Sequence, residues 1–174
     1  MNTNPILIIG TGTVLTDPVH LHLLLNHLPV VGTAFTLVLL LVAFAKNNAE
    51  LKRVGLAFLV LIALLAVAVY LTGKSAEESV MQMEGFEESI IERHAGAAQW
   101  AFGAQVVLGV FALGGLFLSR RGQPLPKWCM ALLLVLTLAV GGLMARTANL
   151  GGEIRHPEIR ASQAPAAAAQ PHGE

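Results

Sequence analysis

The sequence predicts an all-α integral membrane protein, built as an antiparallel four-helix bundle with up-down-up-down connections. Composition is the first reason, because 55% of the 174 residues are hydrophobic and only 13% are charged, whereas a soluble domain carries about 25% charged residues. The second reason is that four uncharged stretches approach or exceed the ~20 apolar residues that cross a bilayer. These stretches are continuous and do not alternate between apolar and polar residues, which argues against transmembrane β-strands.

The four stretches set the expected helices. They cover residues 21–45, 54–72, 95–118 and 128–145. Asp17 followed by Pro18 predicts the start of the first helix, as an N-cap and a proline in the first turn. The pair Gly151-Gly152 predicts the end of the last helix. Short links between the stretches favour antiparallel neighbours.

The rest of the chain divides around this domain. Residues 1–19 are expected to form a short segment before the bundle, residues 20–160 the four-helix membrane domain, and residues 161–174, which are rich in Ala, Pro and Gln, a disordered tail. Within the longest link, 73–94, residues 77–93 are expected to form an amphipathic or extramembrane helical segment that lies over the outer mouth of the bundle.

The 11 basic and 11 acidic residues cancel over the whole chain but not within its links. Links 46–53 and 119–127 are rich in Lys and Arg, whereas link 73–94 holds six Glu against one Lys and one Arg. Lys and Arg mark the cytoplasmic side of membrane proteins. We therefore expect a protein of the bacterial cytoplasmic (inner) membrane, with both termini and the acidic link extracytoplasmic. The zero net charge argues against a nucleic-acid partner.

Five of the six histidines fall at the extracytoplasmic end of the predicted bundle. They are His20, His22, His27, His94 and His156. Ionisable side chains in membrane helices are costly and tend to face the bundle interior or a water-filled path. In an uninterrupted helix His20 and His27 share a face, because they are about 700° apart, while His22 points about 140° away from His27.

The histidine cluster predicts a b-type haem, because imidazole nitrogen is an axial ligand of haem iron. We expect His27 and His94 to be the axial pair. Small residues follow both histidines, at 32–34 and at 95–98, and leave room for a flat group. The same small residues suit close helix packing without any cofactor.

Further residues extend this hypothesis. His22 or His20 together with His156 forms a candidate second site, so the expected number of haems is one or two. Arg146 and Arg155 are candidates for pairing with haem propionates, and interfacial snorkelling is their alternative role.

Two other classes of function remain open on the same residues. The first is a copper- or zinc-binding membrane protein, in which His20 and His22 chelate the metal and the acidic link attracts cations. The second is a structural subunit of a membrane complex, whose histidines only bridge helices. One cysteine, Cys129, excludes an internal disulfide and a zinc site built from several thiolates.

Three motifs occur in order at the predicted helix ends. They are His22-Leu-Leu-Leu-Asn-His27-Leu-Pro29, Glu92-Arg-His94 and Gly151-Gly-Glu-Ile-Arg-His156-Pro-Glu. Over about residues 20–160 the chain resembles small bacterial four-helix membrane proteins of uncharacterised function that carry a H-x4-H-[FL]-P start. The resemblance implies haem b binding or electron transfer through His22, His27, His94 and His156. This chain has Leu23 where many of those proteins have proline, and it has His20 in addition, so the ligand in the first helix stays open.

We therefore expect a small b-type cytochrome that exchanges electrons with quinol or with a periplasmic redox protein. It would act as an electron carrier or redox subunit, alone, as a homo-oligomer or in a larger membrane complex, rather than as a stand-alone enzyme.

Overall fold

The computed structural model describes residues 17–120, 125–156 and 158, so most of the expected segment 1–19 and the expected tail 161–174 lie outside the described residues. The described chain forms five α-helices. They are α1 (Pro18–Leu25), α2 (His27–Ala45), α3 (Ala49–Val80), α4 (Glu88–Ser119) and α5 (Lys127–Arg155). Helices α1 and α2 together, α3, α4 and α5 are each long and apolar enough to cross a membrane.

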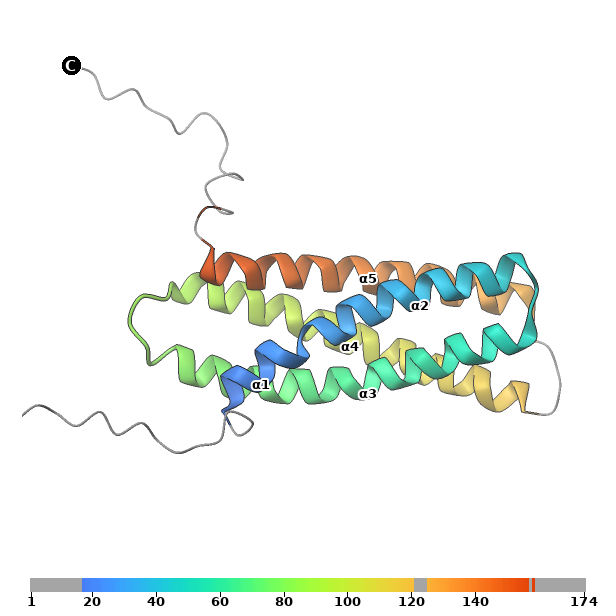
Figure 1. Cartoon of the computed structure of the whole chain (residues 1–174), viewed down its shortest axis with the longest axis horizontal. Helices are drawn as coiled ribbons and strands as arrows, with labels where there is room; N and C mark the ends of the chain where they lie inside the picture. Colours follow the sequence, from blue (N-terminus) through green and yellow to red (C-terminus); the bar gives the residue numbers. More distant parts are fainter. Residues whose placement is uncertain (1–16, 121–124, 157, 159–174) are drawn as a thin grey trace, which may run out of the picture.

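These helices confirm the all-α four-helix membrane bundle. Around its circumference α2 packs on α3, α3 on α4, α4 on α5 and α5 on α2 (Figure 1). Helices α2 and α4 therefore stand on one diagonal, and α3 and α5 stand on the other. One end of the bundle is formed by the start of α1, the end of α3, the start of α4 and the end of α5. We call it the histidine end.

Proline explains why the first membrane segment is divided into α1 and α2. Pro29 has no backbone N–H, and its ring clashes with the carbonyl of the residue four positions earlier, which is Leu25. The helix is interrupted at Asn26, the residue that follows Leu25. The start of α1 is fixed by Asp17, whose side chain accepts a hydrogen bond from the backbone N–H of Val19 (3.0 Å).

Helices α3 and α4 are longer than expected, and a turn divides residues 77–93, which were expected to form one helical segment, between the ends of these two helices. Helix α3 continues to Val80, and α4 begins at Glu88. The polar end of α3 is held by contacts within the helix, including the ion pair between Lys74 and Glu77 (3.1 Å). The connecting turn contains Gly85 at a φ of 90°, a conformation that favours glycine.

The expected end of the last helix at Gly151-Gly152 was also wrong, because α5 runs on to Arg155. Two contacts with α4 explain the extra turn. Gly151 faces the ring of His94, and Glu153 is buried in an ion pair with Arg93 (2.8 Å).

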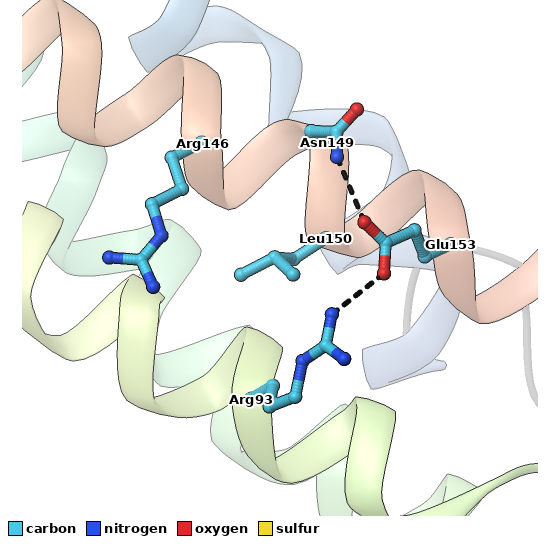
Figure 2. Close-up of a pocket in the computed structure, with 5 residues that line it drawn as sticks. All are labelled: Arg93, Arg146, Asn149, Leu150 and Glu153. Carbon is cyan, nitrogen blue, oxygen red and sulfur yellow. Dashed lines mark hydrogen bonds and ion pairs between the residues drawn. The ribbon is translucent and has the colours of Figure 1, made fainter. Parts of the chain in front are cut away.

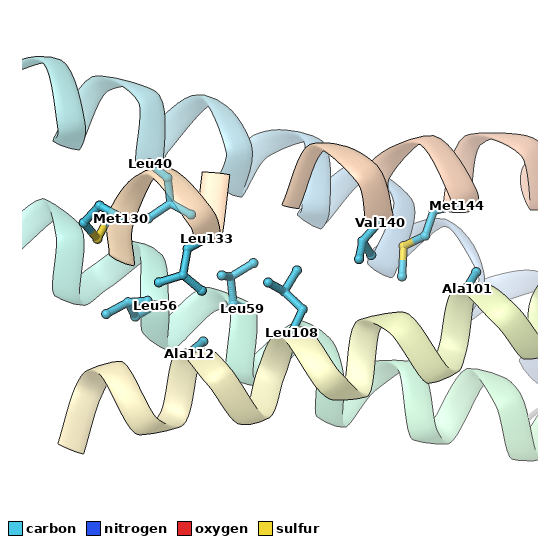
Figure 3. Packing of buried hydrophobic residues seen from close by; sticks show 10 residues of the cluster. All are labelled: Leu40, Leu56, Leu59, Ala101, Leu108, Ala112, Met130, Leu133, Val140 and Met144. Atoms are coloured by element: carbon cyan, nitrogen blue, oxygen red, sulfur yellow. The ribbon is translucent and has the colours of Figure 1, made fainter. Parts of the chain in front are cut away.

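The core of the bundle is apolar and lies between all four membrane segments. Figure 3 shows this packing, in which Leu40, Leu56, Leu59, Leu108 and Met130 are at most 1% exposed. Large apolar side chains also cover the outer faces of the helices, and Trp100, for example, is 78% exposed. A bundle that is apolar inside and outside is suited to hydrocarbon, where these faces contact lipid.

Candidate functional site

His22 and His94 meet at the histidine end of the bundle. His22 comes from α1, which belongs to the same membrane segment as α2, and His94 comes from α4. These two membrane segments stand diagonally opposite each other in the bundle. The ring centroids of the two histidines are 6.4 Å apart, and the ring planes make an angle of 77°. Both side chains are partly buried. The structure therefore places two imidazoles face to edge between the helices.

Each of the two rings is fixed by a backbone carbonyl of a neighbouring helix. His22 Nδ1 donates to the carbonyl oxygen of Val69 on α3 (3.1 Å), and His94 Nδ1 donates to that of Thr147 on α5 (3.0 Å). A carbonyl oxygen can only accept, so each Nδ1 carries the proton and each neutral ring keeps its lone pair on Nε2. Among the described residues neither Nε2 has a hydrogen-bond partner. Metal-ligating histidines are typically oriented in this way.

Each ring also lies against a glycine four residues after the carbonyl that holds it. A Cβ on Gly73 would lie 2.9 Å from His22 Cε1, and a Cβ on Gly151 would lie 3.1 Å from His94 Cε1. The first distance is closer than real Cβ atoms come, and the second is unusually tight. The imidazoles can therefore occupy these positions because no side chain stands there.

The two histidines occupy corresponding places in two similar helix hairpins, α1 to α3 and α4 to α5. In both hairpins the first helix carries the histidine, and the second helix carries the carbonyl and the glycine. The next polar pair along the bundle axis keeps the correspondence, because Thr33 Oγ1 donates to Gln105 Oε1 (3.4 Å) and these two residues are 72 positions apart, as His22 and His94 are (94 − 22 = 72). This pair is fully buried, about 16 Å deeper than the histidines at 1.5 Å per residue.

The other histidines that the sequence singled out are not brought into this pair. The side chains of His20, His27 and His156 are exposed, and His156 Nδ1 lies 2.8 Å from Glu158 Oε1. The ring that lies beside His94 is that of His22, and not that of His27, which was expected to pair with it. The sequence argument identified the helix and the end correctly, but it placed the buried face of the first helix on His27 instead of His22.

The expected second site, built from His22 or His20 with His156, is not brought together in the structure. The ring of His22 lies beside that of His94, and His156 lies beside Glu158. Among the described residues no group of three or more His, Cys, Asp or Glu side chains is arranged to hold a metal ion.

The two arginines expected to bind propionates have different surroundings. The guanidinium of Arg155 lies over the ring of Phe86, 4.6 Å from its centroid. Arg146 lines a pocket of about 560 Å³ together with Arg93, Asn149, Leu150 and Glu153 (Figure 2).

Sequence reasoning missed Gly73, Gly151 and the pair of Arg93 with Glu153. Gly73 and Gly151 resemble ordinary helix-end glycines, and only their positions opposite the histidines reveal their role. A signal for Glu153 existed, since it is an acidic residue shortly after the apolar run of the last helix, but its partner on α4 could not be read from the chain.

The comparisons place the chain in a family of membrane proteins. The family described as "Predicted membrane protein (DUF2231)" matches residues 18–156, which include all five described helices. No curated protein and no solved structure matches the chain. Because the match spans most of its length, this chain belongs to the DUF2231 family of predicted membrane proteins.

Proposed function

We propose that this protein is a small b-type cytochrome of the membrane, in which His22 and His94 are the axial ligands of one haem. The observation that carries the proposal is the pair of imidazoles 6.4 Å apart, each held at Nδ1 and free at Nε2.

The spacing of the rings suits one metal ion between them. A metal–nitrogen bond of ~2 Å, with about 1 Å more from Nε2 to the ring centre, puts two trans imidazoles on one metal about 6 Å apart. The centroid distance of 6.4 Å is close to that value. The separation of the rings therefore matches that of two imidazoles that share one metal ion.

The number of ligands favours haem over a bare zinc ion. Zinc in proteins is usually tetrahedral, with three or four protein ligands. The described residues offer two imidazoles and no third His, Cys, Asp or Glu in a metal-binding arrangement. Two axial ligands are sufficient for haem, because the porphyrin supplies the other four nitrogens.

The hydrogen bonds from Val69 and Thr147 support the same role. A carbonyl that accepts from Nδ1 fixes the tautomer and the ring orientation and raises the basicity of Nε2. Gly73 and Gly151 leave space at the ring edges. Both features are present on both sides of the diagonal, as a ligand pair with equal roles requires.

The chemistry of such a site is electron transfer. His22 and His94 would hold the haem from both sides and would leave its iron no open position for a substrate, so the group would supply electron transfer only. The site lies near one end of the bundle, from which electrons can pass to quinol at the membrane surface or to a periplasmic protein. The protein then serves as an electron carrier or as a redox subunit.

A visible spectrum with metal analysis tests the proposal. Protein purified in detergent from haem-replete cells should show a Soret band and, after reduction with dithionite, a sharp α band, with about one iron and no stoichiometric copper or zinc. His22→Ala and His94→Ala should each lose the haem or bind it with a high-spin iron. His27→Ala is the matched control from the same membrane segment and should keep the wild-type spectrum.

Other outcomes would decide against the proposal. A colourless wild-type protein that contains copper or zinc would favour the metal-binding alternative. A colourless protein without metal would favour a structural subunit, in which the two histidines bridge α1 to α3 and α4 to α5 through their carbonyl hydrogen bonds.

A further inference from the structure

A second group of polar residues lies between α4 and α5 at the histidine end, and the haem proposal does not use it. Figure 2 shows the pocket of about 560 Å³, with Arg93 from α4 and Arg146, Asn149, Leu150 and Glu153 from α5. Arg146 and Arg93 are exposed. The pocket therefore opens on the outer surface of the bundle, whereas the ring of His94 points inward to His22.

One of the two guanidinium groups is fixed by a buried acid. Glu153 is only 3% exposed, and its carboxylate accepts from Arg93 (2.8 Å) and from the side-chain amide of Asn149 (2.9 Å). These two bonds use one oxygen each. Glu153 thus orients Arg93 across the groove between the two helices and neutralises one positive charge.

The second guanidinium has no such partner. Among the described residues no acceptor is bonded to Arg146, which faces the same pocket (Figure 2). With Arg93 and Arg146 positive and Glu153 negative, the pocket carries a net charge of +1. It is thus suited to bind one negative charge.

The position of Arg146 indicates where that charge comes from. Arg146 directly follows the uncharged run of α5 that begins at Trp128, so it stands where the hydrocarbon of a bilayer meets the headgroups. Leu150, one turn further along α5, adds an apolar surface to the pocket. A phosphate with acyl chains beside it fits this combination of positive charge and apolar surface.

We propose that this pocket binds the phosphate of an anionic phospholipid from the leaflet at the histidine end, with Arg146 as the main contact and Arg93 as the second. The inference does not rest on the haem proposal, because the pocket opens outward and shares no lining residue with the pair of His22 and His94.

Lipid binding to delipidated protein in detergent tests the proposal. Native mass spectrometry would compare dioleoylphosphatidylglycerol, which has a net negative charge, with dioleoylphosphatidylcholine, which has none. The wild type should retain one phosphatidylglycerol in preference to phosphatidylcholine. Arg146→Gln should weaken its binding by about tenfold to a hundredfold, the range expected for the loss of a charge-assisted contact. Arg146→Lys should bind with intermediate affinity, because it keeps the charge but not the two-pronged geometry.

Arg155→Gln is the matched control, since Arg155 lies on the same helix end but stacks on Phe86 and does not line the pocket. It should bind phosphatidylglycerol as the wild type does. Circular dichroism of each variant checks that the fold is intact.

A haem-free arm separates this proposal from the previous one. The double variant His22→Ala, His94→Ala should still bind phosphatidylglycerol. Unchanged binding in Arg146→Gln, or equal binding of the two lipids by the wild type, would overturn the proposal. It would also be overturned if Arg146→Gln affected only haem-loaded protein and lost its effect with haem dimethyl ester, because the ligand of Arg146 would then be a propionate.

Discussion

At the scale of single residues, the candidate site depends on which atoms of each histidine are engaged. His22 and His94 use Nδ1 for a hydrogen bond and leave Nε2 available, and each ring lies where a glycine leaves space. His27, five residues after His22, is exposed and makes none of these contacts. The difference between two histidines of one membrane segment is therefore a difference in local surroundings, not in residue type.

Gly73→Ala tests the space that the glycine provides. The added Cβ would lie 2.9 Å from His22 Cε1, so the ring must move away and lengthen its bond to Val69. We expect haem affinity to fall by about tenfold or more, which corresponds to a loss of about 1.4 kcal/mol, as measured by haem titration of the purified protein. Gly103→Ala is the control, since nothing lies within 4 Å of its added Cβ. Equal affinity in both variants would show that Gly73 does not position the ring.

At the scale of helices, the division between α1 and α2 leaves the rotation of the first membrane segment nearly unchanged, because Asn26 keeps right-handed helical dihedral angles (φ −60°, ψ −27°) and its N–H bonds to the carbonyl of His22. An uninterrupted helix through residues 18–45 was the basis for placing His20 and His27 on one face. His22 and His27 are five residues apart, about 140° of rotation at 100° per residue, so the orientation that brings the partly buried His22 to His94 leaves His27 exposed. Proline is tolerated in membrane helices because neighbouring groups compensate for the lost hydrogen bond.

Pro29→Ala restores a backbone N–H that can bond to the carbonyl of Leu25 and join α1 to α2. Closing this bond should straighten the segment and shift α1 against α3, which should lengthen the 3.1 Å hydrogen bond between His22 and Val69. Without haem, Pro29→Ala should melt at the same or a higher temperature than the wild type, because proline inside a helix costs up to about 3 kcal/mol. With haem, the variant should give a weaker low-spin signal than the wild type. Thermal melting followed by circular dichroism and haem titration measure the two effects.

The control for this variant is Pro126→Ala, because Pro126 is the N-cap of α5 and no helical hydrogen bond is missing there. If Pro29→Ala kept full haem affinity, the helix interruption would have no part in positioning His22.

At the scale of the whole molecule, sequence reasoning predicted the number of membrane helices, their order and the end at which five histidines lie. Continuous apolar runs are sufficient for this, because backbone hydrogen bonding in lipid leaves few alternatives to a helix. It could not predict the pair of His22 with His94, since that depends on the rotation of each helix about its axis and on two glycines of other helices. Likewise the ends of α3 and α5 were missed, because polar contacts within α3 and contacts of α5 with α4 extend the two helices beyond their apolar runs.

The distribution of charge predicts the orientation of the bundle. Lys and Arg predominate in the links between α2 and α3 and between α4 and α5, whereas the turn between α3 and α4 is rich in Glu. A positive-inside arrangement places the histidine end outside the cytoplasm. Alkaline phosphatase fused within residues 81–87 should be active, and a fusion within residues 46–48 should be inactive. The reverse result would place the pair of His22 and His94 on the cytoplasmic side and would exclude a periplasmic electron partner.

The central claim is that His22 and His94 bind one haem iron from opposite sides, and electron paramagnetic resonance of the oxidised wild-type protein tests it most directly. With the imidazole planes 77° apart, each ring would interact mainly with a different one of the two iron dπ orbitals, and these orbitals would be nearly equal in energy. The account predicts a low-spin ferric signal with a strongly anisotropic g tensor, absent from His22→Ala and retained in His27→Ala. A high-spin signal in the wild type, or a low-spin signal that survives in His22→Ala and disappears in His27→Ala, would contradict it.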